Sequence, residues 1–371
     1  MSVTSVRLLP YSLPLRDPWP TAEGPVRERH GCVIAIEDAD GRIGYGDTAP
    51  LPGFGLETIA SSVASLRLAA RRLIDLPAER FLEAAANLPY LAQVAASPAA
   101  RHAIDLALHD LAAQRAGVTI ARLLGGDAAL ASVPVNATIP RVEPERAAAL
   151  AREAVATGAT TIKIKVGGAP LALDLSRLRA VRDAIGPGVK LRLDANQAWS
   201  EREAIEALTA MRVYEIEYVE QPLPAAEVEG MARVRRAADV PIAADEAVRN
   251  KEGARRLLES GAADLLIVKP MVLGGLHAAR AVCDQARDLG ADVVVTSLVE
   301  SAVGRAGALH LAASLGKTGR AHGLATGTAL ARDVAEGPRV EAGSIALPAG
   351  PGLGVRLDDA ALLAATRVEA A

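Results

Sequence analysis

The sequence predicts an α/β protein, a modified (β/α)8-type barrel preceded by an α+β domain. From about Ser132 onward, short β-branched or aliphatic runs alternate with alanine-rich segments of helical spacing. This alternation predicts βαβ units and a parallel sheet. The first 130 residues lack it, which indicates a separate domain. No dinucleotide fingerprint follows the first strand of the chain, so an open Rossmann sheet fits less well than a barrel.

The N-terminal part, residues 1–130, is expected to be a capping domain that covers the barrel. Its stretch GCVIAIEDADGRIGYGDTAP, residues 31–50, predicts a β-hairpin that turns at Asp40-Gly41, because Asp-Gly favours tight turns. Alanine- and leucine-rich helices follow, including residues 98–117.

The barrel is expected over residues 131–342. Seven strands are predicted, with a weak eighth at the end, and they cover residues 133–139, 160–166, 189–196, 214–222, 240–246, 263–270, 291–297 and 321–327. One helical segment between them ends at Gly290, a typical C-terminal cap. Residues 343–371 come too late for the barrel and are expected to return to the capping domain.

Composition narrows the class of protein. Half of the 371 residues are apolar, and the net charge is −3 from 41 basic and 44 acidic residues, so a large core is expected and a nucleic-acid surface is not. We find neither a signal peptide nor a membrane helix and expect a cytoplasmic protein with no membrane partner. Cys32 and Cys283 are expected to be buried thiols. The sequence does not decide between a monomer and a homo-oligomer.

Charged residues stand at the predicted strand ends, where barrels of this kind carry their active sites. Strand three offers Asp194 and Asn196, strand four Glu220, strand five Asp245 and Glu246, and strand six Lys269. The spacings of 26, 25 and 24 residues each equal one βα unit, so these residues are expected at one height. Three converging carboxylates without nearby His or Cys predict a Mg²⁺ site, with Mn²⁺ as a substitute.

Strand two poses a question of orientation. Side chains alternate along a strand, so Lys163 and Lys165 are expected on the inner face and Ile162, Ile164 and Val166 against the helices. Lysines on opposite sides of a metal-bound carboxylate suit proton abstraction beside that carboxylate, since burial and neighbouring cations lower a lysine pKa. The partner is then a small-molecule carboxylate. A barrel scaffold without activity would not explain charged residues in phase at one rim.

Five motifs carry a family resemblance: KIK (163–165), DAN (194–196), EQP (220–222), ADE (244–246) and VKP (268–270). Together they resemble the enolase superfamily and its muconate-lactonizing-enzyme subgroup over essentially the whole chain. The resemblance implies that Asp194, Glu220 and Asp245 are Mg²⁺ ligands, that Lys165 and Lys269 are the acid/base pair, and that Lys163 supports them.

The resemblance also implies a lid. The capping domain would reach the substrate near residues 19–24 and in the segment APLPGFGLET, residues 49–58, which includes Phe54. Asn196, Ser297 and Glu300 would contact substrate. The segment LGGLHAAR, residues 273–280, resembles a helix N-terminus that holds an anion, here expected to be a substrate carboxylate.

Two loops favour one activity within the subgroup. TSLVESAVG (296–304) and HGLATGTALARDV (322–334) resemble loops of o-succinylbenzoate synthases, lyases that catalyse a dehydration in menaquinone biosynthesis. Thr296-Ser297 stands where those enzymes more often carry Ser-Ser. Dipeptide epimerases tend to carry Asp-x-Asp in the last loop to bind an α-ammonium group, and Ala325 and Gly327 stand there instead. N-succinylamino acid racemase, dipeptide epimerase and muconate-type cycloisomerase activities remain alternatives.

Overall fold

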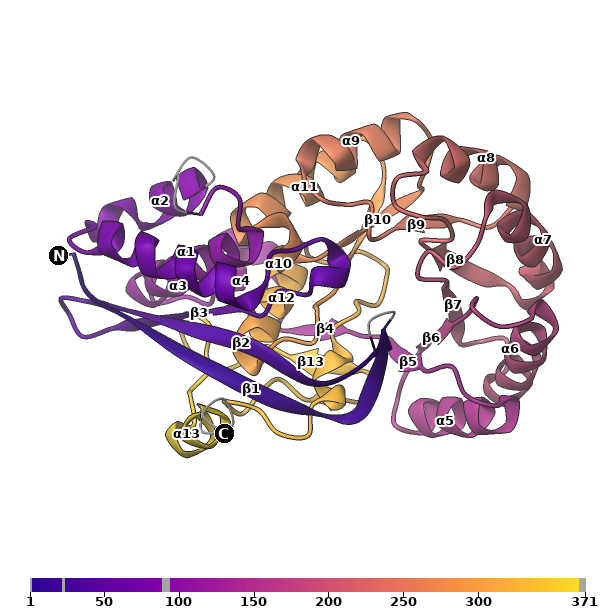
Figure 1. Ribbon diagram of the computed structural model, residues 1–371, viewed down its shortest axis with the longest axis horizontal. Helices are drawn as coiled ribbons and strands as arrows, with labels where there is room; N and C mark the ends of the chain where they lie inside the picture. The colour runs from indigo at the N-terminus through magenta and orange to yellow at the C-terminus, as the bar shows by residue number, and fades with distance from the viewer. Residues whose placement is uncertain (1, 22–23, 89–93, 367–371) are drawn as a thin grey trace.

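The N-terminal domain is built on a three-stranded antiparallel sheet. The structure is a computed structural model that describes residues 2–21, 24–88 and 94–366 (Figure 1). The strands β1 (Val3–Thr21), β2 (Gly24–Asp38) and β3 (Ile43–Thr48) pair in the order β1-β2-β3. Gly41 has a φ of 77° in the turn between β2 and β3, so the predicted hairpin is confirmed.

Helices cover one face of this sheet. They are α1 (Ile59–Leu73) and α3 (Pro98–Ala116), which contact its strands; α2 (Phe81–Asn87) packs on α3, and α4 (Ile120–Gly125) follows α3 along the chain. Buried side chains from β2, α1 and α3, such as Ile34, Leu66 and Leu108, form one apolar cluster. A Cβ at Gly46 would lie 1.8 Å from the carbonyl oxygen of Ala103, so glycine at that position lets α3 lie directly against β3.

The barrel sheet is parallel, and its strands are neighbours in the order in which they follow along the chain. Its strands are β5 (Ala137–Ile139), β6 (Thr161–Lys165), β7 (Lys190–Asp194), β8 (Ile216–Glu220), β9 (Ile242–Ala244), β10 (Leu265–Val268) and β11 (Asp292–Val295). The helices that follow them are α5 (Pro144–Ala156), α6 (Leu171–Ile185), α7 (Glu201–Met211), α8 (Val228–Ala238), α9 (Lys251–Glu259), α10 (Pro270–Leu273), α11 (Leu276–Asp288) and α12 (Ala302–Ser314). The modified barrel fold is confirmed, with helices along its outer side (Figure 1).

The weak eighth strand closes the barrel with very few residues. His322 bridges to Val135 on one side, and Gly323 bridges to Thr296 on the other. The Nδ1 atom of His322 also accepts a hydrogen bond from the amide of Val295 at 2.9 Å. The first predicted strand, 133–139, is divided in the structure, because Val135 and Asn136 turn toward this closure between β4 (Ser132–Pro134) and β5.

The C-terminal segment contacts both parts of the molecule. The short strands β12 (Val340–Glu341) and β13 (Ser344–Ala346) form a small antiparallel sheet with β4. Further on, the amide of Leu353 donates to Asp110 of α3 at 2.7 Å, and α13 (Asp359–Thr366) contacts β1.

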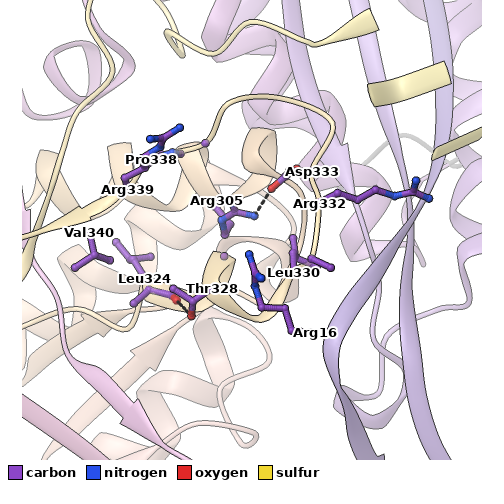
Figure 2. Close-up of a pocket in the computed structure, with 14 residues that line it drawn as sticks. Arg16, Arg305, Leu324, Thr328, Leu330, Arg332, Asp333, Pro338, Arg339 and Val340 are labelled. Atoms are coloured by element: carbon purple, nitrogen blue, oxygen red, sulfur yellow. Dashed lines mark hydrogen bonds and ion pairs between the residues drawn. The ribbon is translucent and has the colours of Figure 1, made fainter. Parts of the chain in front are cut away.

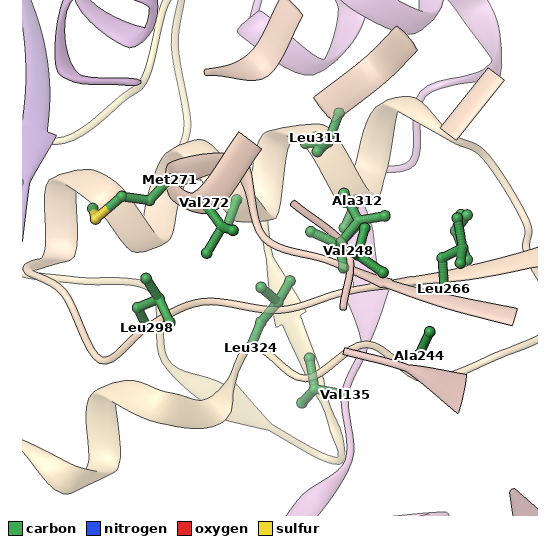
Figure 3. Close-up of a cluster of buried hydrophobic side chains, with 14 of the residues drawn as sticks. Val135, Ala244, Val248, Leu266, Met271, Val272, Leu298, Leu311, Ala312 and Leu324 are labelled. Atoms are coloured by element: carbon green, nitrogen blue, oxygen red, sulfur yellow. The ribbon is translucent and has the colours of Figure 1, made fainter. Parts of the chain in front are cut away.

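The main core lies between the barrel and its outer helices. Ile162, Ile164 and Val166 are fully buried in it, so the predicted outward face of β6 is confirmed. Figure 3 shows part of this core, with Leu266 of β10, Ala312 of α12 and Val248 among its labelled side chains. Cys32 and Cys283 are buried thiols, as predicted. Among the described residues, no helix is long and apolar enough to cross a membrane.

Candidate active site

The strand register brings the predicted residues together at one rim. Lys165 pairs with Asp194 across β6 and β7, and Asp194 pairs with Glu220 across β7 and β8. Glu220 is in register with Ala243 and that residue with Leu265, so Asp245 stands two residues and Lys269 four residues further along their strands. The predicted common height therefore holds for three strands. On β9 and β10 the stagger of a barrel places Asp245 and Lys269 further along the strand direction. Because these offsets are even numbers of residues, both side chains still point toward the barrel interior.

Lysine side chains lie between the carboxylates. The Nζ atom of Lys163 is 3.1 Å from Asp194 Oδ2 and 3.1 Å from Glu220 Oε1. Lys165 Nζ is 3.2 Å from Asp194 Oδ2. Lys269 forms an ion pair with Asp245. The predicted inward direction of both lysines on β6 is thus confirmed. Within the described residues, no three acidic, His or Cys side chains form a ready metal cluster, because ammonium groups separate them.

Burial and charge shift the pKa values of these groups. Burial raises the pKa of Glu220 to about 7, and the nearby charge of Asp194 adds to this effect. Burial also raises the pKa of Asp245. Asp194 responds differently, since Lys163 and Lys165 outweigh its burial and lower its pKa. Burial lowers the pKa of Lys163, but the charges of Asp194 and Glu220 outweigh it and the net pKa is well above the ordinary value. The rim thus carries an excess of buried negative charge.

Sequence reasoning gave no role to two residues at this rim. Gln221 is fully buried, and its Oε1 accepts hydrogen bonds from the amides of Asp245 at 2.9 Å and Ala247 at 3.3 Å, which fixes the end of β9. Glu246 is buried with an Oε2 atom that has no hydrogen-bond partner among the described residues, and burial raises its pKa. The EQP and ADE motifs contained both, but neither motif by itself indicates which way the side chains point.

The donor set fits a divalent cation. Asp194, Glu220 and Asp245 are at most 5% exposed and offer only oxygen atoms. One carboxylate oxygen of the neighbouring Glu246 has no hydrogen-bond partner among the described residues, and burial raises the pKa values of Glu220, Asp245 and Glu246, so a cation here would offset the cost of keeping these carboxyls charged.

The capping domain reaches the rim through residues 49–56 of the predicted lid segment 49–58. Phe54, in the 3-10 turn Pro52–Phe54, places its ring 4.6 Å from Lys269 Nζ. The amide of Ala49 donates to the sulfur of Met271 in α10 at 3.4 Å. A Cβ on Gly55 would lie 2.7 Å from Arg249 Nη1, so this glycine lies close to the loop after β9. The other predicted lid segment, 19–24, includes residues 22–23, which lie outside the described residues.

The remaining predicted substrate contacts are placed differently from one another. Asn196 Oδ1 accepts a hydrogen bond from Lys165 Nζ at 2.5 Å and so belongs to the rim. Ser297 Oγ lies 2.5 Å from Thr326 Oγ1 on the last loop. Glu300 is 2% exposed, and its carboxylate accepts a hydrogen bond from the amide of Leu298, so it closes its own loop. Direct contact of these residues and Phe54 with substrate stays a prediction.

The predicted anion site at the N-terminus of α11 is filled by the protein itself. Asp105 of α3 accepts hydrogen bonds from the amides of Leu276 and His277. A Cβ on Gly275 would lie 2.5 Å from the Asp105 carboxyl carbon. The prediction that a substrate carboxylate lies there was therefore wrong, and this terminus instead joins the two domains.

A hollow lies against the last loop, after the strand that closes the barrel. It has a volume of about 380 Å³ and is lined by residues of β1, α12 and the segment 324–340, with four arginines among them (Figure 2). Arg305 at its centre is 6% exposed and pairs with Asp333 at 2.9 Å. None of the lysines or carboxylates of the rim lines this hollow.

The fold and the rim together define a class: a capped barrel with inward lysines and carboxylates at the carboxyl ends of its strands. Family models agree. "Mandelate racemase / muconate lactonizing enzyme, N-terminal domain" matches residues 3–125, and "Enolase C-terminal domain-like" matches residues 146–361. The chain therefore belongs to the enolase superfamily and to its muconate-lactonizing-enzyme subgroup, and it is an enzyme of that superfamily.

Curated relatives within this family carry different activities. A hydrophobic dipeptide epimerase of Enterococcus faecalis is 32% identical over 318 residues, which is 85% of this chain and 88% of the relative. An o-succinylbenzoate synthase of Thermobifida fusca is 44% identical over 209 residues, which is 56% of this chain and 63% of that relative. Identity is thus higher to the synthase, but over a shorter part.

A solved structure shows the same architecture. The Enterococcus faecalis dipeptide epimerase complexed with Mg and the dipeptide L-Leu-L-Tyr superposes with a TM-score of 0.88 at 31% identity, over 96% of this chain and 99% of the other. The whole capped-barrel arrangement is therefore shared with an enzyme whose structure contains magnesium.

Proposed function

We propose that this protein is a Mg²⁺-dependent carbon–oxygen lyase with o-succinylbenzoate synthase activity. Its substrate would be a small carboxylate, 2-succinyl-6-hydroxy-2,4-cyclohexadiene-1-carboxylate, which loses water and becomes aromatic. We also infer a cytoplasmic location for this activity.

Lys165 is the proposed base. Its side chain is 28% exposed, compared with 14% for Lys163 and 8% for Lys269, so it is the lysine of the rim most open to a substrate. Its Nζ takes the proton from the carbon next to the substrate carboxylate. The electron pair forms the new ring double bond, and the hydroxyl leaves with the proton that Lys165 returns, as water. Lys269 stays charged and stabilises the negative charge that develops.

The cation would be held by Asp194, Glu220 and Asp245. Bound there, Mg²⁺ would supply positive charge that stabilises the substrate carboxylate as the neighbouring proton leaves. Magnesium in the structures of dipeptide epimerases supports this proposal, as does the unpartnered carboxylate oxygen of Glu246. Mn²⁺ is expected to substitute, because it accepts the same oxygen ligands.

The observation that carries the choice of substrate is the last loop. The 3-10 segment Ala325–Ala329 has no acidic residue, so it offers no carboxylate that would pair with an α-ammonium group. A Cβ at Gly327 would lie 2.7 Å from the guanidinium of Arg305, and that guanidinium is held by Asp333 and the carbonyl of Glu300. An aspartate could enter position 327 only if this buried arginine moved.

The second candidate is epimerisation of a dipeptide, or racemisation of an N-succinylamino acid. It is favoured by curated relatives that match most of the chain, such as the Enterococcus faecalis dipeptide epimerase. A racemase would use Lys165 and Lys269 as two proton carriers on opposite sides, so the rim alone suits both reactions. A muconate-type cycloisomerase is a third possibility within the same subgroup.

The experiment compares three substrate classes with one protein. Purified wild-type enzyme with Mg²⁺ is given the cyclohexadiene carboxylate, and separately N-succinylamino acids and dipeptides in D₂O. We expect fast aromatisation, seen as ultraviolet absorbance, and little deuterium at the α-carbons. Fast α-exchange without aromatisation would overturn the proposal in favour of the racemase or epimerase. The Lys165→Ala variant, run in parallel, reports any uncatalysed dehydration.

A further inference from the structure

The loop after β11, residues 297–301, is held by buried charged groups at almost every position. Glu300 accepts from the amide of Leu298. Arg305 donates to the carbonyl of Glu300 at 2.8 Å. Asp47 accepts from the amide of Ser301 at 3.1 Å and from its hydroxyl at 2.7 Å. This loop carries Ser297 to the last loop, so its shape fixes where the Ser297 hydroxyl lies.

Val299 stands in this loop with a strained backbone. Its φ is 62°, in the left-handed region, where β-branched side chains are genuine outliers because Cβ crowds the backbone. Such a conformation persists only when its surroundings impose it. The carbonyl of Val299 accepts a hydrogen bond from Arg29 Nε at 3.3 Å.

Arg29 comes from the capping domain and is 4% exposed. The other nitrogens of its guanidinium donate to the carbonyls of Ala49, at 2.5 Å, and Pro50, at 3.4 Å. Within the described residues, three carbonyl oxygens accept hydrogen bonds from this guanidinium, and the charges of Glu300 and Asp47 act on it without forming an ion pair within 4.0 Å. Burying a cation without an ion pair is costly, which speaks against a purely incidental position.

We propose that Arg29 is a positioning residue that clamps the lid segment 49–56 to the strained loop at Val299. One guanidinium thus sets two loops that come from different domains, and both carry predicted substrate contacts, Phe54 on the first and Ser297 on the second. The kinetic consequence rests on the proposed function, but the clamp itself does not.

The first test is kinetic, with rescue. Arg29→Met should lower kcat/KM about 100-fold, the order of a misplacement of about 1 Å, with KM raised and kcat lowered together. Adding Val299→Gly should restore roughly tenfold of that loss, because glycine adopts a φ of 62° without strain and no longer needs the clamp. Arg7→Met, an exposed arginine of the same domain, should leave both constants unchanged. If Val299→Gly gives no rescue, or if Arg7→Met falls equally, the clamp is overturned.

The second test needs no substrate. Hydrogen exchange of the Leu298 and Ser301 amides should become at least tenfold faster in Arg29→Met and unchanged in Arg7→Met. Unchanged exchange would overturn the clamp even if the enzyme proved to be the synthase, and faster exchange would support it even if the substrate proved to be a dipeptide.

A third comparison covers the case in which Arg29→Met does not fold. In the wild-type background, Val299→Gly should melt at a higher temperature than Val299→Ala, since alanine keeps the left-handed strain and glycine relieves it. A lower melting temperature for the glycine variant would contradict the strain on which the clamp depends.

Discussion

The two sides of the barrel mouth are built in different ways. On one, which we term the register side, Lys163, Lys165, Asp194 and Glu220 come from strands β6, β7 and β8, whose carboxyl ends pair in register. On the other, the contact side, residues 296–301 and the lid segment 49–56 are held by side chains from distant parts of the chain. The groups proposed for proton transfer are thus placed by strand pairing, while the groups proposed to contact the substrate depend on how the domains dock.

The largest loss of activity is expected when the carboxylates of the rim are replaced. Asp194→Asn, Glu220→Gln and Asp245→Asn should each abolish measurable turnover, because each removes an anionic ligand from the proposed cation site. All three should stay folded. Mg²⁺ should raise the melting temperature of the wild type and not of the variants, since only a site in the folded protein stabilises it.

The control for this prediction is Asp127→Asn, because the Asp127 side chain is 90% exposed and pairs with the surface residue Arg122. It should keep both turnover and the Mg²⁺-dependent melting shift. Wild-type turnover in any one of the three variants would remove that residue from the site.

The lysines are the next most sensitive positions. Lys165→Ala and Lys269→Ala should each cost at least ~10³-fold in kcat, the order expected for loss of a general base or of a charge stabiliser in a dry site. Steady-state kinetics with circular dichroism at the same protein concentration measures this. Lys317→Ala, on the surface, should be silent. A loss of only a few-fold at Lys165 would show that another group takes the proton.

The contact side should respond more moderately. Deleting Pro52–Gly55 removes Phe54 from Lys269 and should raise KM and lower kcat together, by about 100-fold in kcat/KM, because the substrate is no longer enclosed. Phe54→Leu keeps apolar bulk without the aromatic face and should lose less. If the deletion changes only the melting temperature, the segment supports the fold and is not a lid.

The last expected effect concerns the dependence of stability on pH, with no change in turnover. Burial raises the pKa of Asp47 from 3.8 to about 7, against the hydrogen bonds from Ser301 and Tyr11. The folded protein then binds a proton more tightly than the unfolded chain, so this contribution is full below about pH 4 and is lost as pH rises through about 7. At 1.36 kcal/mol per pKa unit the full change is roughly 4 kcal/mol.

Urea unfolding of wild type and Asp47→Asn at pH 5 and pH 8 measures this contribution. The free energy of unfolding should fall between these pH values by more in the wild type than in Asp47→Asn. Comparing the two proteins cancels the other titrating groups, including the rim carboxyls. If the free energy of unfolding changes equally in both proteins between pH 5 and pH 8, Asp47 is already charged at pH 5 in the folded protein.

The sequence by itself determined the barrel and the register side. Periodicity of two along residues 161–166 was enough to turn both lysines inward, and the spacing of one βα unit was enough to bring Asp194 next to Glu220. Such features are local and repeat along the chain, so tertiary context does not alter them. The sequence also contained Gln221 and Glu246 within its motifs, but not the direction of their hydrogen bonds.

Tertiary structure alone decided the contact side. Arg29 and Val299 are separated by 270 residues, and Asp47 and Ser301 by 254, so no local pattern indicates that they meet. A valine is expected to be extended, yet docking of the capping domain accompanies a left-handed Val299. Asp105 likewise reaches the N-terminus of α11 from 171 residues away, where the sequence suggested a substrate carboxylate. Contacts of this kind depend on the packing of two domains, and a buried charge then finds whichever partner that packing brings within reach.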